Sequence, residues 1–141
     1  MPSIPARGRS VRILLVDDHR LFTQSLMALL GEDDRLDVVG IAENGVQAVE
    51  LATDLVPDVI VMDVKMPVMD GLEATRRIRK KGIRSQILIL TGTDAPMSSE
   101  EAAKAGASGY LRKEQDIEDL RSVFLEAASL AAILGTPTSG R

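Results

Sequence analysis

Short apolar runs alternate with amphipathic stretches along most of this 141-residue chain. The apolar runs have strand length and predict five buried strands, over residues 11–16, 36–42, 58–62, 86–90 and 108–112. Between and after them, apolar residues recur at helical spacing and predict five helices, over residues 20–30, 46–56, around 72–78, 98–106 and 117–134. This alternation predicts an α/β fold, a doubly wound parallel sheet with helices on both faces, because right-handed crossovers place them there. The first and third strands carry the strongest apolar runs and are expected to be central.

Length and composition fit a single domain, since 45% of the residues are hydrophobic. We expect a flexible tail over residues 1–10, the domain over 11–134, and a tail or linker over 135–141. The chain has no cysteine, signal peptide or membrane-length apolar run, which favours a soluble cytoplasmic protein without membrane contact. Seventeen basic against twenty-one acidic residues give a net charge of −4, which argues against direct nucleic-acid binding.

Polar residues follow the predicted strands at the ends where parallel sheets place their chemistry. Asp17 and Asp18 follow the first strand, Asp63 the third, Thr91 the fourth and Lys113 the fifth. Carboxylates that converge without a partner repel one another, and a cation removes that cost. Oxygen ligands without a cluster of His or Cys suit Mg²⁺, which completes its coordination with water and phosphate oxygens. The pattern therefore indicates phosphoryl chemistry.

Each of these residue types has a role in such chemistry. Asp63 is the candidate nucleophile, because a carboxylate accepts a phosphoryl group as an acyl phosphate. Asp17 and Asp18 would hold the metal. Lys113 would place a positive charge beside a phosphate oxygen, and the Thr91 hydroxyl would donate a hydrogen bond to another.

Four motifs in order, "LLVDDH", "VIVMDVKMPVMDG", "LILTGT" and "AGASGYLRKE", resemble the receiver domain of two-component response regulators. The resemblance covers residues 11 to about 130 and implies the strand order 2-1-3-4-5. It further implies that Asp63 is the phosphoacceptor. Asp18 and Asp63 would be direct Mg²⁺ ligands, with Asp17 assisting and the backbone carbonyl of Lys65 completing the set. Thr91 and Tyr110 match the pair whose side chains reorient on phosphorylation.

The family resemblance also implies partners. A sensor histidine kinase would donate the phosphoryl group, and a homodimer is possible. Phosphorylation would change the surface made by the fourth helix, fifth strand and last helix. "DDH" together with a lysine followed by an acid resembles the subfamily that carries a LuxR-type helix-turn-helix output domain. That output domain is not in the sequence, so the chain is expected to be the receiver part of a transcriptional regulator or to act through its own surface. Glu114 stands where family members often have proline, so the usual cis Lys–Pro turn is not expected.

Simpler interpretations stay open for several residues. Asp17 and Asp18 would suit helix capping, Tyr110 would suit an edge strand with its hydroxyl in water, and the basic run 76–84 would suit a solvated surface. His19, the only histidine, is expected to face solvent without a chemical role. For the whole chain, the alternatives to a phosphoacceptor switch are a phosphorylation-independent docking module and a Mg²⁺-dependent phosphohydrolase with a substrate pocket.

Overall fold

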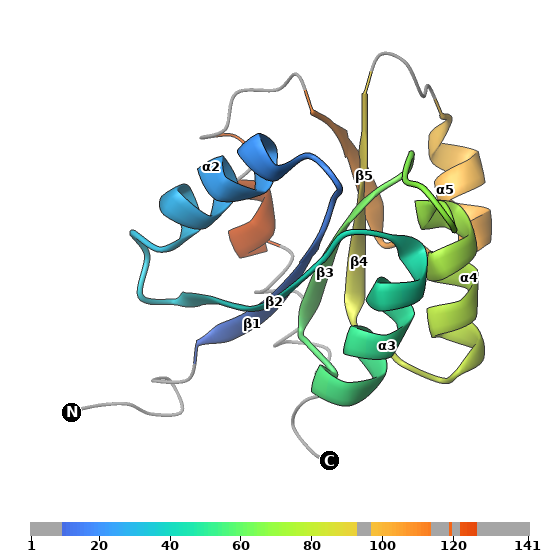
Figure 1. Cartoon of the computed structure of the whole chain (residues 1–141), viewed down its shortest axis with the longest axis horizontal. Coiled ribbons are helices and arrows are strands. Elements are labelled where there is room, and N and C mark those ends of the chain that lie inside the picture. The colour runs from blue at the N-terminus through green and yellow to red at the C-terminus, as the bar shows by residue number, and fades with distance from the viewer. Residues whose placement is uncertain (1–9, 93–96, 114–118, 120–121, 127–141) are drawn as a thin grey trace.

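The computed structural model describes residues 10–92, 97–113, 119 and 122–126, and they form one layer of strands between two layers of helices (Figure 1). The five strands are parallel and lie in the order β2-β1-β3-β4-β5. Their bounds are β1 Val11–Val16, β2 Leu36–Ala42, β3 Val59–Asp63, β4 Gln86–Thr91 and β5 Gly109–Arg112. The predicted fold class and strand order are confirmed, with β3 in the middle of the sheet and β1 beside it.

The helices alternate with the strands as the apolar spacing predicts. They are α2 Arg20–Leu30, α3 Gly45–Leu55, α4 Gly71–Lys80 and α5 Ser99–Ala105, and residues 119 and 122–126 are also helical. Phe124 is fully buried, as the predicted apolar face of the last helix requires. The structure does not describe the remainder of that predicted helix or residue 114. The two predicted tails, apart from Ser10, also lie outside the described residues, so the predicted domain boundaries stay predictions.

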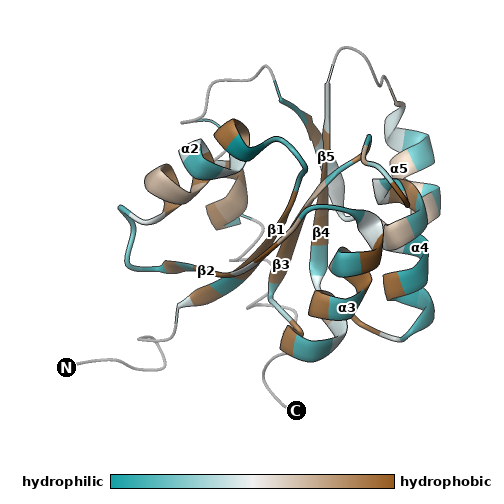
Figure 2. Cartoon of the chain, viewed as in Figure 1, coloured by the Kyte–Doolittle hydropathy of each residue, from teal (hydrophilic) through white to brown (hydrophobic). Residues whose placement is uncertain are grey.

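Two apolar clusters fill the spaces between sheet and helices. The central strands that supply them carry stretches of brown, the hydrophobic colour, in Figure 2. Alternate side chains of β1 and β3 enter opposite clusters, because successive strand residues point to opposite faces. On one face Leu14 and Ile60 pack with small residues of α3 and α4, and on the other Ile13 and Val61 pack with α2 and Phe124. Both faces of the central strands are buried, which explains their continuous apolar runs.

Helix boundaries follow local chemistry. Asn44, Asp70 and Ser98 cap α3, α4 and α5 by accepting a backbone N–H with the side chain. Gly106 closes α5 in the left-handed region at φ 106°, as predicted. Helix α3 ends at Leu55, one residue before the predicted end, and its C-cap Val56 has φ 42°, because a residue preceding proline avoids the helical conformation. Among the described residues, no helix has the length and apolar character that crossing a bilayer requires.

Candidate functional site

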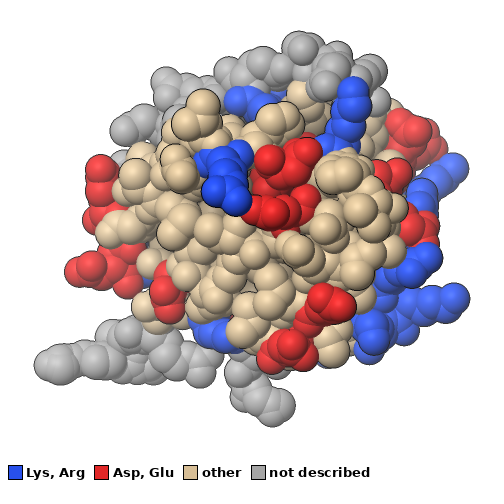
Figure 3. All heavy atoms as spheres, viewed as in Figure 1, with Lys and Arg blue, Asp and Glu red and all other residues tan. Residues whose placement is uncertain are grey.

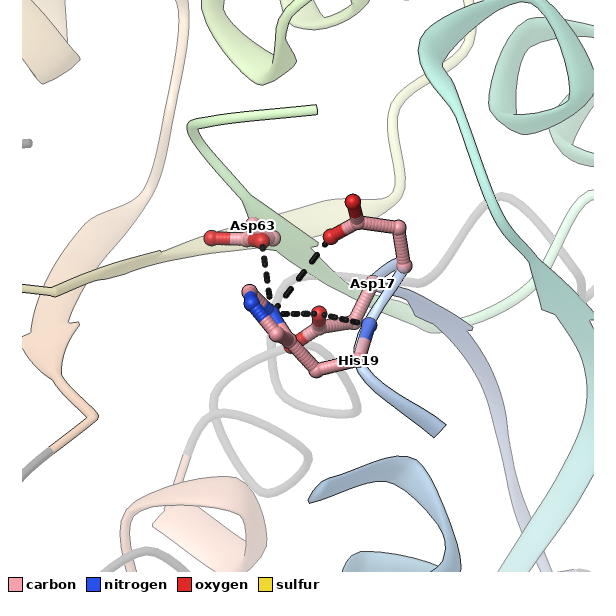
Figure 4. Close-up of side chains that lie close together, drawn as sticks. Asp17, His19 and Asp63 are labelled. Carbon is pink, nitrogen blue, oxygen red and sulfur yellow. Dashed lines mark hydrogen bonds and ion pairs between the residues drawn. The ribbon is translucent and has the colours of Figure 1, made fainter. Parts of the chain in front are cut away.

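The predicted acids meet at the carboxyl ends of β1 and β3. Asp63 is the last residue of β3, one position further than the predicted strand end, and Asp17 directly follows β1. Both are buried, with 3% and 4% of their surface exposed, whereas Asp18 is exposed. In Figure 4 the side chains of Asp17, His19 and Asp63 point toward one another. The structure therefore brings these acids together at the strand ends, and their chemical roles stay predictions.

Helix capping does not account for the two acids that precede α2. The N-cap residue of α2 is His19, which makes no side-chain cap hydrogen bond. Asp17 Oδ1 accepts the backbone N–H of His19 at 2.8 Å, outside the helix. The other carboxylate oxygen of Asp17 points into the acid cluster toward Lys113.

Lys113 supplies the positive charge at this site. Its Nζ lies 2.8 Å from Asp17 Oδ2 and 3.3 Å from Asp63 Oδ2. The residue follows β5, and its backbone N–H donates to Thr91 O at 2.7 Å, which ties the loop to the end of β4. The ammonium also lies 5.0 Å from the centre of the Phe22 ring, a cation–π distance. Four strand ends and the first turn of α2 thus position one lysine over two buried carboxylates.

The electrostatics of the cluster act most strongly on Asp63. Burial, and next the negative charge of Asp17, raise the pKa of Asp63 to about 6 against the opposing pull of Lys113. One ammonium therefore does not fully compensate the two buried acids. At neutral pH the carboxylate of Asp63 is still mostly ionised, which is the form that a nucleophile needs.

The donor set fits a divalent cation. Asp17, Asp18, His19 and Asp63 each offer a ligand atom, and these atoms lie within 4.8 Å of one another. Asp17 Oδ2 is fully buried and receives no well-aligned hydrogen bond, although Lys113 Nζ is near enough for an ion pair. A hard cation with open positions for water and phosphate oxygens would satisfy such carboxylates, so the residues fit Mg²⁺.

Thr91, Tyr110 and Lys65 lie around this cluster. Thr91 is buried at the end of β4, and its hydroxyl donates to Leu111 O on β5 at 3.4 Å. Tyr110 is half-buried on the edge strand β5 opposite Ile89 and packs against the cluster under α3, α4 and α5, so both the packed edge residue and the switch residue stay open as interpretations. Lys65 is exposed in the loop after β3, and the metal role of its carbonyl stays a prediction.

Gly71, the first residue of α4, lies directly against the backbone of Asp63. A Cβ on Gly71 would lie 2.1 Å from the carbonyl oxygen of Asp63, and Gly71 N donates to Val64 O at 2.8 Å. The first turn of α4 therefore packs directly on the residue that carries the candidate nucleophile. Only the tertiary structure, in which the start of α4 approaches the end of β3, reveals this role of Gly71.

His19 is exposed, as predicted, with 64% of its side chain accessible to solvent. Its Nδ1 nevertheless lies 2.9 Å from Asp17 Oδ1 and 3.4 Å from Asp18 Oδ1. His19 is the N-cap of α2 and has an extended backbone, with φ −93° and ψ 99°, and in this conformation its ring lies beside the acids. Its position directly after two acids is the sequence signal that could have indicated this contact.

The basic run of α4 lies away from this cluster, on the side where blue side chains gather in Figure 3. Arg76 and Arg77 are exposed and pair with Glu73 at 3.0 and 2.9 Å, as expected for a solvated helix face. Arg79 is an exception, because it is half-buried and donates to the carbonyl oxygens of Ile83 and Gly106. Burial lowers the pKa of Arg79. Its contacts join α4 to the end of α5.

Comparison with known proteins identifies the class. The model of the response regulator receiver domain matches residues 13–124, so the chain belongs to that family. A curated relative is the transcriptional regulatory protein YvfU of Bacillus subtilis, 40% identical over 110 residues, which cover 78% of this chain and 55% of the relative. The chain spans about half the length of the curated relatives it matches.

Solved structures agree with this family and with the fold. The receiver domain of the putative response regulator NarL from Mycobacterium tuberculosis has a TM-score of 0.80 at 30% identity, covering 86% of this chain and 98% of that one. A two-component response regulator of the LuxR family from Aurantimonas has a TM-score of 0.76 at 33% identity, covering 85% of this chain and 86% of that one. The predicted resemblance to receivers of the LuxR type is thereby confirmed. Mg²⁺ binding and phosphorylation are typical of this family.

Proposed function

We propose that this chain is a phosphoacceptor switch that takes a phosphoryl group from a sensor histidine kinase onto Asp63. The observation that carries the proposal is the buried Asp63 carboxylate, held 3.3 Å from the ammonium of Lys113 beside Asp17. A buried acid with an upward-shifted pKa and a specific cationic partner is typical of a reactive group. The family membership supports the same reading.

In the transfer step an oxygen of Asp63 attacks the phosphorus of the donor. A P–O bond to Asp63 forms while the P–N bond of the phosphohistidine breaks, and the electron pair of that bond stays with the departing imidazole. Lys113, already beside Asp63 Oδ2, would contact an oxygen of the transferred group. Asp17, Asp18, Asp63 and the Lys65 carbonyl would hold Mg²⁺, which supplies charge neutralisation for the phosphoryl oxygens when bound.

Acetyl phosphate and intact-mass measurement test this step. With Mg²⁺, the wild-type chain should gain the mass of one phosphoryl group, and EDTA should prevent the gain. Asp18→Ala should weaken Mg²⁺ binding measured by calorimetry, because it removes a direct ligand. No gain in mass together with no binding of Mg²⁺ would instead favour the phosphorylation-independent docking module.

The phosphoryl group would be sensed through Thr91 and Tyr110. The Thr91 hydroxyl now makes only a 3.4 Å contact with Leu111 O, so a stronger acceptor on Asp63 would draw it away. Movement of Thr91 would let the Tyr110 ring turn inward and alter the surface of α5, β5 and the last helix.

NMR spectra with beryllofluoride, a phosphoryl mimic, test the relay. In the wild type, signals of α5 and of Phe124 should shift on adding the mimic, and in Thr91→Ala they should shift much less. Thr53→Ala is the matched control, because the exposed Thr53 hydroxyl bonds to Val49 O within α3. Shifts of wild-type size in Thr91→Ala would remove Thr91 from the relay.

The relatives support a role in transcription through another domain. The matched solved proteins include one titled a DNA-binding response regulator of the LuxR family from Staphylococcus aureus. We propose that this receiver controls such an output domain and that the 141-residue chain alone does not bind DNA specifically, given its charge of −4. A sequence-specific gel shift with this chain at physiological salt would overturn the second statement.

A further inference from the structure

The imidazole of His19 faces the same centre as the three carboxylates. Its Nδ1 lies 2.9 Å from Asp17 Oδ1 and 3.8 Å from Asp63 Oδ2. It also lies 3.0 Å from Lys113 Nζ. An imidazole nitrogen that lies close to carboxylate oxygens and to an ammonium is in a position to bind a metal ion. Neither the sequence pattern nor the family resemblance gave His19 a role.

The contacts of His19 Nδ1 with Asp17 and with Lys113 cannot both be hydrogen bonds, because one needs a proton on Nδ1 and the other needs Nδ1 without a proton. A hydrogen bond to Asp17 requires a proton on Nδ1, whereas acceptance from the Lys113 ammonium requires a lone pair there. A cation placed between the imidazole and the carboxylates satisfies the lone pair and the oxygens together. The fully buried Asp17 Oδ2, which receives no well-aligned hydrogen bond, is a second group that such a cation would serve.

The spacing matches the coordination shell of a metal ion. Ligand atoms about 2.1 Å from a six-coordinate ion are separated by about 3.0 Å when adjacent and about 4.2 Å when opposite. The distances from His19 Nδ1 to oxygens of Asp17, Asp18 and Asp63 are 2.9, 3.4 and 3.8 Å, within or close to that range. Lys113 Nζ, 2.8 Å from Asp17 Oδ2 and 3.0 Å from His19 Nδ1, shows that a positive group already fits among them.

The donor chemistry then points to a second class of metal. Carboxylates and carbonyls suit Mg²⁺, whereas imidazole suits zinc and its transition-metal neighbours. We propose that His19 is a metal ligand, so that the site binds a borderline transition-metal ion such as Zn²⁺ in addition to Mg²⁺. The inference rests on the metal site of the proposed function and adds an imidazole to it. Zn²⁺ would then compete with Mg²⁺ for the acids around Asp63.

The sequence makes the test sharp, because His19 is the only histidine and there is no cysteine. Zn²⁺ titrated into the ¹⁵N-labelled, unphosphorylated chain at neutral pH should shift the Nδ1 resonance, saturating at one ion per chain. The shift should be lost in Asp17→Asn/Asp63→Asn, since an ion held by the cluster needs its carboxylates. In calorimetry, His19→Gln should lower the ratio of Zn²⁺ to Mg²⁺ affinity about tenfold or more.

Three results would overturn the inference: an Nδ1 resonance that does not move at saturating Zn²⁺, an affinity ratio unchanged in His19→Gln, or a Zn²⁺ shift that persists in the double variant. The last would mean that the ion binds His19 outside the acid cluster. None of these measurements uses phosphoryl transfer. A wild-type chain that gains a phosphoryl group with Mg²⁺ would therefore keep its proposed function even if His19 proved not to be a ligand.

Discussion

Strand β3 has a buried aspartate at each end, and the two differ in what surrounds them. Asp58 directly precedes the strand and Asp63 ends it, with 5% and 3% of their surface exposed. Asp58 Oδ2 accepts the backbone N–H of Arg12 at 2.9 Å, and the main chain of Asp58 bonds to Arg12 and Gln86. Asp63 instead meets Asp17, His19 and the ammonium of Lys113.

The difference shows that burial alone does not make a carboxylate reactive. At the amino end of the sheet, Asp58 pairs with a backbone donor at the start of the ladder and so joins β1 to β3. At the carboxyl end, Asp63 is grouped with a like charge and a single lysine, which leaves its negative charge partly uncompensated. The first arrangement stabilises the fold, and the second is suited to chemistry.

The largest expected contrast is in phosphorylation. With Mg²⁺ and acetyl phosphate, Asp63→Asn should show no phosphoryl gain, because the amide is not a competent nucleophile. Asp58→Asn should gain as much as the wild type, since its amide oxygen still accepts the Arg12 N–H. Intact mass measures both. Loss of the gain in a folded Asp58→Asn protein would contradict the contrast.

The backbone at the Asp63 end should tolerate no added side chain at Gly71. Gly71→Ala places a Cβ 2.1 Å from the Asp63 carbonyl oxygen, so α4 or the end of β3 must move, at an expected cost of about 3 kcal/mol in the free energy of unfolding. Gly109→Ala is the matched control, because its Cβ would make an ordinary 3.5 Å contact with Leu88. Urea unfolding measures both. Equal stabilities of the two variants would show that the close approach at Gly71 is relieved cheaply.

The pH dependence of stability should come from the Asp63 end of the strand. The folded pKa of about 6 exceeds the ordinary value of 3.8, so between these pH values the folded chain holds a proton that the unfolded chain has released. This contribution to stability is full below about pH 4 and is lost as the pH rises to about 6, a fall of about 3 kcal/mol at about 1.4 kcal/mol per pH unit.

Urea unfolding in metal-free buffer from about pH 4 to about pH 7 would measure that fall. Asp63→Asn should remove it, because the amide does not titrate. Asp58→Asn should keep it, because Asp63 is intact there. Parallel pH curves for the wild type and Asp63→Asn would contradict the assigned pKa.

A smaller effect is expected from truncation at the Asp58 end. Asp58→Ala leaves the Arg12 N–H without its side-chain acceptor and should lower the free energy of unfolding by about 2 kcal/mol. Asp58→Asn keeps an acceptor and should cost less than about 1 kcal/mol. Denaturant midpoints at neutral pH would compare them. An Asp58→Ala protein as stable as the wild type would mean that water replaces the carboxylate.

The sequence by itself determined the alternation of strands and helices and which residues stand at the strand ends. Apolar runs such as 11–16 predicted strands with their bounds nearly correct, because a strand buried on both faces must be apolar throughout. Since parallel strands end at one edge, Asp17, Asp63 and Lys113 were predictable neighbours before any coordinates. The order of the strands came from the family resemblance.

Only the tertiary structure decided how these side chains meet. Lys113 lies closer to Asp17 than to Asp63. The ring of His19 contacts the acids, and Gly71 packs against the backbone of Asp63. The tertiary structure also showed that Asp58, at the start of the predicted third strand, is buried and hydrogen-bonded to the backbone N–H of Arg12. Each of these contacts depends on side-chain direction and on close approach between segments distant in sequence or across a turn. Local periodicity carries no information about either.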